Sequence, residues 1–332
     1  RYGFLALDQM VRQYATREGL DAVRTLRPLL EGETEEIRRK REELLAYEAR
    51  LRDFLGQRDG QRTCIQELEQ MAQAHPRRDL EARVSLNWSS YFTATGDLRQ
   101  AKEFALQGLQ ELGPDNDPPR LRMDLLRALG MACFSSGEPT QALDHYLLGI
   151  AIAKQLKDRN AEGTFWNAMG LVQFNLGQSP KALEYYDKAH ALMRKLGDRR
   201  GEANALGNRG LVYWALGEYN RAFEALEKSK ALFAEIGFKK GQAATLGNIG
   251  VLHHKLGRYT EALHCYERAL VLRRDIHDRA GEGHDLLNLG TAYMHLGDVR
   301  RAEEHFEGGK WLAHEVGSAY LLAESLNSLG IV

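Results

Sequence analysis

A chain of 332 residues is long enough for two ordinary domains or for one array of stacked repeats. Its 45 basic and 46 acidic side chains leave a formal charge of −1, which argues against a nucleic-acid surface because such surfaces carry a strong positive excess. No apolar run approaches the roughly 20 residues that a membrane-spanning helix needs. We therefore expect neither nucleic acid nor a membrane among the partners, and the seven prolines favour a mostly helical fold.

The three cysteines are far apart in the sequence and show none of the paired spacings of disulfide frameworks or zinc sites: Cys64, Cys133 and Cys265. We interpret them as free thiols in a reducing compartment, which predicts a cytoplasmic protein. The sequence ends at Val332, seven residues before another Leu-Gly turn would fall, and we expect it to be a piece of a longer protein.

Three columns of small residues repeat in phase along the chain. A glycine recurs every 40 residues, at Gly130, Gly170, Gly210, Gly250, Gly290 and Gly330. A second glycine follows seven residues later, at Gly137, Gly177, Gly217, Gly257 and Gly297. An alanine follows that, at Ala142, Ala182, Ala222, Ala262 and Ala302. Self-similarity at a fixed period indicates stacked supersecondary units, so function should lie in a surface shared between repeats.

Residues 201–240 show the pattern of one unit, which predicts two helices. Apolar positions three and four apart indicate a first helix that ends at Gly217, through Ala205, Leu206, Val212 and Tyr213. The same spacing indicates a second helix that ends near Gly237, through Ala222, Ala225, Leu226, Leu232 and Phe233. Neither helix can bury its apolar stripe alone. We therefore predict an all-α fold in which helix pairs stack into a right-handed α-solenoid.

Acidic residues mark where the predicted helices begin. An aspartate stands at the start of several first helices, where it is suited to cap the helix: Asp158, Asp198 and Asp278. An acid that follows the turn glycine favours the start of the second helix, at Asp97, Glu218 and Asp298.

These residues resemble the tetratricopeptide repeat over residues 122–332. The family's small residue between packed helices corresponds to Gly210, its alanine to Ala222 and its bulky residue to Leu226. Its first aromatic residue survives as Trp166 but is leucine in the other units. The usual unit of the family has 34 residues, and the 40-residue form here implies longer helices.

We expect three regions along the chain. Residues 121–332 would hold five regular 40-residue units and a truncated sixth, and residues 42–120 would hold degenerate units of the same kind. Residues 1–41 would form an N-terminal helical segment. This segment is either a helix that caps the array or a remnant of the winged-helix segment that precedes repeat arrays in bacterial STAND signal-transduction ATPases, which residues 1–20 resemble.

The sequence shows no constellation for catalysis. It has no Gly-x4-Gly-Lys phosphate loop and no Gly-x-Ser-x-Gly nucleophile elbow. The densest group of metal-binding residue types cannot converge from the two helices of one unit: His253, His254, His264 and Cys265. We therefore predict no enzyme activity, no metal and no cofactor within this segment.

The resemblance implies that first helices line a concave groove, and it selects candidate binding residues. Four positions after each signature glycine stands a large side chain: Phe134, Phe174, Trp214, His254 and Met294. Two or three positions before it stand Arg127, Asn167, Asn208, Asn248 and Asn288. Amides can hold a peptide backbone without selecting its sequence, and aromatic rings supply contact area at a small entropy cost. The alternative is that these side chains bridge and pack neighbouring helices.

We place the centre of the predicted groove between Asn204 and Lys255. Gly207 and Gly247 lie there inside a predicted first helix, where glycine costs roughly 1 kcal/mol relative to alanine. Either a close helix or a ligand would explain the bare backbone. The lysine and asparagine of the carboxylate clamp that grips chaperone tails are missing, since Gly207 and Leu211 occupy those positions.

The repeated Gly-Asn-x-Gly, Leu-Gly-x-Tyr and Asp-Arg-x-Gly-Glu patterns resemble those of two families. One is the Partner of Inscuteable type of adaptor, and the other is the sensor array of bacterial STAND proteins. We favour the second and predict a non-enzymatic module that binds an extended peptide or protein segment, as the sensor of a larger signalling protein. The alternatives are a free-standing adaptor and a scaffold that self-associates through its convex face. The sequence leaves the oligomeric state open.

Overall fold

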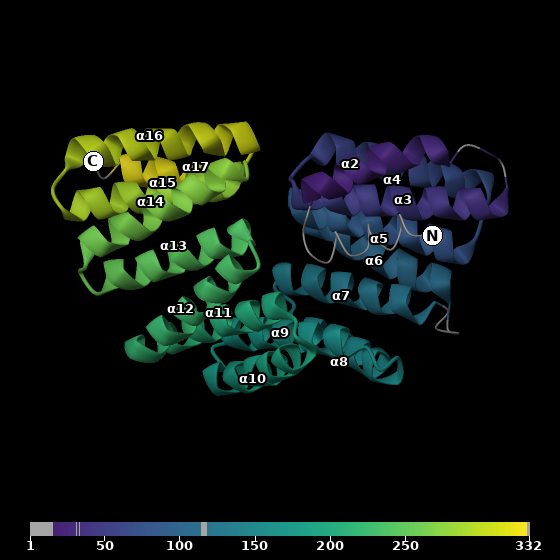
Figure 1. The fold of residues 1–332 in the computed structure, drawn as a ribbon, viewed down its shortest axis with the longest axis horizontal. Helices are drawn as coiled ribbons and strands as arrows, with labels where there is room; N and C mark the ends of the chain where they lie inside the picture. The colour runs from purple at the N-terminus through teal and green to yellow at the C-terminus, as the bar shows by residue number, and fades with distance from the viewer. Residues whose placement is uncertain (1–15, 31, 33, 114–117, 331–332) are drawn as a thin grey trace. The chain divides into compact units, whose positions relative to one another are not determined.

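The computed structural model describes residues 16–30, 32, 34–113 and 118–330, which form helices and connecting turns with no strand among them (Figure 1). The helices follow one another as antiparallel pairs, which confirms the expected all-α solenoid of helix pairs. Most of the segment that we compared with a winged helix falls in residues 1–15 and lies outside the described residues.

Short turns join the helices of each pair. The first helices are α3 (Glu35–Phe54), α5 (Arg78–Thr95), α7 (Pro119–Ser135), α9 (Arg159–Asn175), α11 (Arg199–Ala215), α13 (Lys239–Lys255) and α15 (Arg279–His295). The second helices are α4 (Arg58–Ala74), α6 (Leu98–Leu112), α8 (Pro139–Gln155), α10 (Ser179–Leu196), α12 (Tyr219–Glu235), α14 (Tyr259–Asp275) and α16 (Val299–Val316). The pairs are preceded by α2 (Thr16–Leu26) and a 3-10 turn, η1 (Arg27–Leu29), and followed by α17 (Ala319–Leu329).

The chain divides into two compact units, residues 1–172 and 173–332, with the division inside α9. Consecutive helices pack against each other from α2 to α8 in unit 1 and from α10 to α17 in unit 2. First helices also contact the first helices of adjacent pairs: α3 contacts α5 and α5 contacts α7 in unit 1, while α11, α13, α15 and α17 form such a series in unit 2. We call this series of α11, α13, α15 and α17 the first-helix wall of unit 2.

The predicted boundary after residue 41 needs correction, because it falls inside the continuous helix α3. This helix begins after Thr34, whose side chain accepts a hydrogen bond from the Ile37 backbone N–H at 3.4 Å. The first turns of α3 are charged and lack the small residues of the repeat pattern, so the pattern did not predict that α3 pairs with α4. The pair α3–α4 therefore starts at residue 35, and whether it is a degenerate unit of the same repeat stays a prediction.

Most of the predicted helix caps are present. Each aspartate predicted to cap a first helix accepts a hydrogen bond from the backbone N–H three residues later. The donors are Gly201 for Asp198 at 2.9 Å, Gly281 for Asp278 at 3.2 Å and Ala161 for Asp158 at 3.0 Å. Asp97 and Asp298 cap second helices in the same way, at 3.1 Å each. Glu218 makes no cap hydrogen bond, and its carboxylate pairs with Arg221 instead.

In four pairs the signature glycine makes room for a bulky side chain 16 residues later. A Cβ atom at Gly250 would lie 2.5 Å from Cε1 of Tyr266, and one at Gly210 would lie 2.7 Å from Cγ of Leu226. Gly130 faces Tyr146 and Gly290 faces Phe306 in the same manner. The alanines of the third column are fully buried at Ala142, Ala182, Ala222, Ala262 and Ala302. The 40-residue pattern is therefore a packing rule that lets two helices approach closely.

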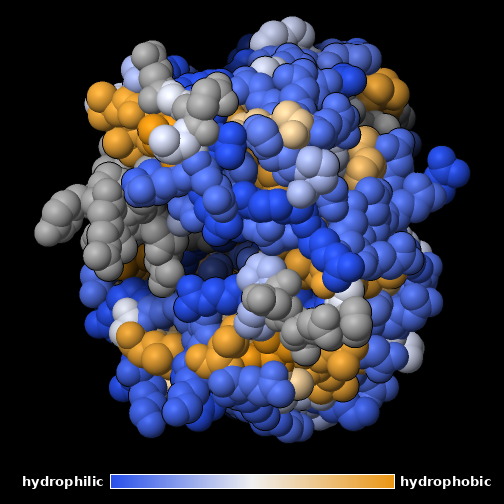
Figure 2. Space-filling view, turned by 90° about the vertical axis from the view of Figure 1, so that its right-hand side faces the viewer, coloured by the Kyte–Doolittle hydropathy of each residue, from blue (hydrophilic) through white to orange (hydrophobic). Residues whose placement is uncertain are grey.

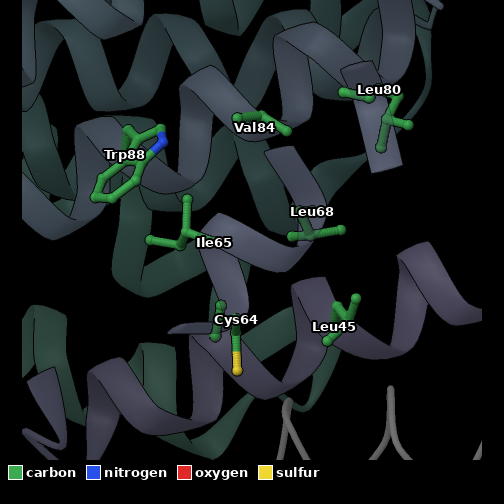
Figure 3. Close-up of a cluster of buried hydrophobic side chains, with 9 residues drawn as sticks. Leu45, Cys64, Ile65, Leu68, Leu80, Val84 and Trp88 are labelled. Atoms are coloured by element: carbon green, nitrogen blue, oxygen red, sulfur yellow. The ribbon is translucent and has the colours of Figure 1, made fainter. Parts of the chain in front are cut away.

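The core of unit 1 is continuous across several helices. Figure 3 shows side chains from α3, α4 and α5 that point toward one another, among them Leu45, Ile65, Leu68, Val84 and Trp88. Cys64 lies in the same cluster, and its burial raises the pKa of the thiol to about 12. A thiol that stays protonated at neutral pH is a packing group rather than a nucleophile.

The surface is mostly polar. Figure 2 shows one face of the molecule on which hydrophilic residues predominate and hydrophobic residues gather in separate patches. Over the residues that the structure describes, no helix combines the length and apolar character needed to cross a bilayer.

Two glycines of α13 provide a test of the packing rule. We expect Gly250→Ala to lower the free energy of unfolding by about 1–3 kcal/mol, because the added methyl group would strike the buried ring of Tyr266. The matched change Gly247→Ala adds a methyl group 3.5 Å from Oδ1 of Asp285, an ordinary contact, and alanine gains up to about 1 kcal/mol in helix propensity. Urea denaturation followed by circular dichroism should rank Gly247→Ala above Gly250→Ala in stability. Equal midpoints would contradict the rule.

Candidate functional site

Three candidate residues lie in unit 1. Arg127 and Phe134 are half-buried on α7, and the Arg127 guanidinium lies 3.9 Å from the carboxylate of Asp124 one turn earlier. Asn167 is half-buried on α9 and interacts with other residues of the chain. No described contact joins these three residues into one site.

The structure brings two candidate residues of unit 2 together. Trp214 on α11 and Asn248 on α13 line one pocket of about 80 Å³ between neighbouring first helices. Leu226 and Leu252 form its buried floor, and Leu211 and Val251 complete its sides. Trp214 also packs partly against the cluster that contains Leu226 and Leu252. The pocket is therefore a small, mainly apolar recess with one amide at its edge.

Leu211 and Val251 were not among the predicted site residues. Each follows a signature glycine by one position, so each is one turn from the aromatic column on the same helix face. Their column continues as Met131, Leu171 and Thr291, and all five side chains are half-buried. The sequence did not show that this mostly apolar column is half-exposed. That exposure depends on how closely neighbouring first helices approach each other.

The asparagines separate into two groups. Asn248 and Asn288 are half-buried and Asn204 is exposed, and none of their amides makes a side-chain hydrogen bond within the described part of the chain. Asn208 is half-buried and interacts with other residues, as Asn167 does. The amides of Asn204, Asn248 and Asn288 are therefore available to a ligand. Asn167 and Asn208 interact within the chain, which agrees with the alternative that such asparagines bridge neighbouring helices.

The large side chains of the predicted ladder also differ in role. Phe174 packs against Tyr186 and Val212, and Met294 packs against the cluster of Leu287 and Phe306. Both are half-buried. Part of the surface of these two side chains therefore serves the core, as the packing alternative expected.

His254 and Lys255 lie at the carboxyl end of α13. The ring of His254 is 4.8 Å from that of His295 and 5.2 Å from that of Tyr259, which itself stacks on His295 at 4.8 Å. Burial lowers the pKa of His254, and the positive charges of His295 and Lys255 lower it further. Lys255 is exposed.

The two glycines of the predicted groove floor face neighbouring helices. A Cβ atom at Gly207 would lie 3.1 Å from Oγ of Ser229 on α12, and that hydroxyl donates to the carbonyl of Ala203 at 2.8 Å. Close helix packing thus explains Gly207. At Gly247 only Asp285 is near, at an ordinary contact distance.

The histidine-rich segment of α13 and α14 is a packing region in the structure. The His253 ring lies 4.8 Å from the ring of Phe223, whereas His264 is exposed. Among residues 16–30, 32, 34–113 and 118–330, no three histidines, cysteines or acids are placed to hold a metal ion.

Comparison with known families identifies the repeat. Residues 160–235 and 241–309 match the model of the tetratricopeptide repeat, from the start of α9 to α16. No curated protein sequence matches the chain. The resemblance to the tetratricopeptide repeat is therefore confirmed for these residues.

Several solved structures share the fold at low sequence identity. A Rap protein complexed with Competence and Sporulation Factor has a TM-score of 0.65 at 14% identity, covering 99% of this chain and 96% of its own. NprR in complex with its cognate peptide NprX has a TM-score of 0.56 at 17% identity, covering 80% and 78%. A STAND protein with a tetratricopeptide repeat sensor, from Pyrococcus horikoshii, has a TM-score of 0.62 at 14% identity, covering 97% and 48%. The described residues thus form an all-α solenoid of helix pairs, in which residues 160–235 and 241–309 carry tetratricopeptide repeats.

A buried ion pair joins α15, one helix of the first-helix wall, to the second helix α14. Asp285 on α15 is 2% exposed, and it accepts a hydrogen bond from Nε of Arg273 on α14 at 3.3 Å. Arg273 also pairs with Asp278. A Cβ atom at Gly281 would strike the Arg273 guanidinium, so this glycine makes room for the pair. Burial raises the pKa of Asp285 from 3.8 to about 7, although Arg273 opposes the rise.

This raised pKa predicts a pH-dependent stability. In the unfolded chain the Asp285 carboxyl would ionise near pH 4, whereas in the folded protein it holds its proton to about pH 7. Its contribution to stability is therefore complete below pH 4 and is lost as the pH rises from 4 to 7. Asp285→Asn mimics the neutral carboxyl, so we expect the melting temperature of this variant to rise relative to the wild type over that range. If the melting temperature of Asp285→Asn instead falls relative to the wild type between pH 4 and 7, the ion pair with Arg273 stabilises the fold by more than the burial of the charged carboxylate costs.

Proposed function

Since residues 160–235 and 241–309 carry tetratricopeptide repeats, we propose that unit 2 binds an extended peptide or protein segment along its first-helix wall. The observation that carries this proposal is the pocket that Trp214 and Asn248 share. One side offers a large indole surface and the other an amide with no partner in the described part of the chain.

The two kinds of group suit different parts of a peptide. The apolar recess beside Trp214 can bury one aliphatic side chain, which contributes about 1.5–3 kcal/mol. The Asn248 amide can donate to a backbone carbonyl and accept from a backbone N–H, which holds an extended chain in register. Asn204 and Asn288 offer the same chemistry on the neighbouring helices α11 and α15.

Proteins with similar folds support this proposal. The NprR structure is named as a complex with a peptide, and the Rap structure as a complex with Competence and Sporulation Factor. The Pyrococcus horikoshii protein is named as a STAND ATPase with a tetratricopeptide repeat sensor, and the present chain spans about half of it.

We assign the chain the role of a non-enzymatic sensor module within a larger bacterial signalling protein in the cytoplasm. Any catalytic step would then belong to another domain of that protein. A nucleotide-binding P-loop encoded in the same gene would support the sensor role, and a gene without one would favour the free-standing adaptor of the Partner of Inscuteable type.

Self-association through second helices is a second candidate function. Leu147 and Leu148 on α8 are 49% and 56% exposed, and Leu106 on α6 is 41% exposed. The corresponding positions of other pairs carry charges, as Asp187 and Lys188 in α10 show. Exposed leucines on second helices of unit 1 could therefore contact another copy of the chain.

Trp214→Ala and Asn248→Ala test the proposed groove. We expect a peptide selected from a phage-displayed dodecapeptide library on the wild type to bind Trp214→Ala at least tenfold more weakly, because the apolar recess loses its wall. Asn248→Ala should weaken binding about two- to tenfold through the lost amide. Fluorescence polarisation measures the affinities, and circular dichroism checks that both variants stay folded.

Two substitutions on second helices control for residue type. Trp311→Ala removes a tryptophan that is 60% exposed on α16, and Asn220→Ala removes an exposed asparagine on α12. Neither should change peptide affinity. Equal losses in the wall variants and these controls would reject the groove.

The leucine patch has its own test. If second helices mediate self-association, the wild type should exceed the chain mass of 37.5 kDa in light scattering, and Leu147→Glu with Leu148→Lys should restore the monomer. These changes copy the charges found in α12, at Glu227 and Lys228. A wild type that is monomeric at 100 μM would exclude this second function.

A further inference from the structure

The turn that joins α13 to α14 differs in charge from the equivalent turns. Lys255 ends α13 and Arg258 precedes α14, and both side chains are exposed. At the position of Arg258 the other pairs carry an acidic or neutral residue: Glu138, Gln178, Glu218 and Asp298. At the position of Lys255 three of them carry Ser135, Asn175 and Ala215. The turn between α13 and α14 thus carries two positive charges, which we call the basic cluster.

These charges are not neutralised within the described part of the chain. Neither Lys255 nor Arg258 forms an ion pair there, whereas Glu138, Glu218 and Asp298 pair with Lys102, Arg221 and Arg301 respectively. The nearest acid along the chain is Glu261, in the first turn of α14, and it makes no ion pair within the described residues either. The turn therefore presents a net positive charge to solvent.

Helix-end electrostatics do not explain the basic cluster. Basic residues near a helix carboxyl end interact favourably with the helix dipole, by a few tenths of a kcal/mol to about 1 kcal/mol. However, α7, α9 and α11 end without any basic residue in their last turn. The array does not need cations at these positions in order to fold.

The basic cluster adjoins the pocket on the same helix. Val251 lines the pocket, and Lys255 stands one turn further along α13. Beside it, the ring of His254 contacts the rings of Tyr259 and His295, which stack on each other. A segment whose aliphatic side chain enters the pocket would pass close to the basic cluster.

We propose that the segment bound beside Trp214 carries an acidic side chain that docks against Lys255 and Arg258. This inference rests on the proposed function, and it specifies the chemistry of the partner as an aliphatic residue with an aspartate or glutamate near it. An exposed charge pair of this kind changes affinity by a small factor, and it weakens as salt rises.

The test uses the peptide selected from the dodecapeptide library, made with blocked ends so that only side chains carry charge. It is compared with a version in which each Asp or Glu is replaced by Asn or Gln. We expect the acidic version to bind the wild type about three- to fivefold more tightly in 50 mM salt, and the gap to shrink in 500 mM salt. The double variant Lys255→Gln and Arg258→Gln should close the gap.

A matched double variant controls for net charge. Arg194→Gln with Lys195→Gln removes two exposed basic residues from the last turn of α10, a second helix, and should leave the gap unchanged. Selected peptides without acidic residues, or a gap that survives Lys255→Gln and Arg258→Gln, would overturn the acidic partner while leaving the groove intact. A library that yields no peptide dependent on Trp214 would overturn both the groove and this inference.

Discussion

The close approach of the two helices in each pair is the constraint on which the structure depends. A signature glycine on the first helix leaves space that a bulky side chain of the second helix fills, as Tyr266 does at Gly250. Because the contact recurs at a fixed spacing, it sets the repeat length, the burial of the alanine column and the direction of each helix face. The wall residues flank this contact, since the positions one and four after the glycine are half-buried, as Leu211 and Trp214 show.

Much of the fold could be predicted because it is encoded locally. Glycines, alanines and capping aspartates lie within one unit and act on helices a few residues away, so their pattern survives in the sequence. The start of α3 could not be predicted, because its charged first turns lack the small residues that mark the other pairs. There the helix is fixed by its packing on α4 and α5, which only the folded chain shows.

The candidate site could be predicted only in part. The column rule placed Trp214 and Asn248 on neighbouring helices, and the structure joins them in one pocket. It could not separate Asn248, whose amide is available, from Asn208, which interacts within the chain. That difference depends on which side chains of neighbouring helices come within reach in the folded chain. The same limit applies to Asp285, whose burial against Arg273 leaves no trace in its spacing.

Contacts in each unit join helices that are adjacent or two apart in the chain, and this has a kinetic consequence. Such a low contact order means that little loop entropy is lost before stabilising contacts form, so folding can nucleate at any pair and spread to its neighbours. Unfolding can begin at an end pair while the remaining pairs stay folded. A ligand that spans α11 and α13 would therefore join two helix pairs that can otherwise unfold separately, and its binding would make the unfolding of these pairs more cooperative.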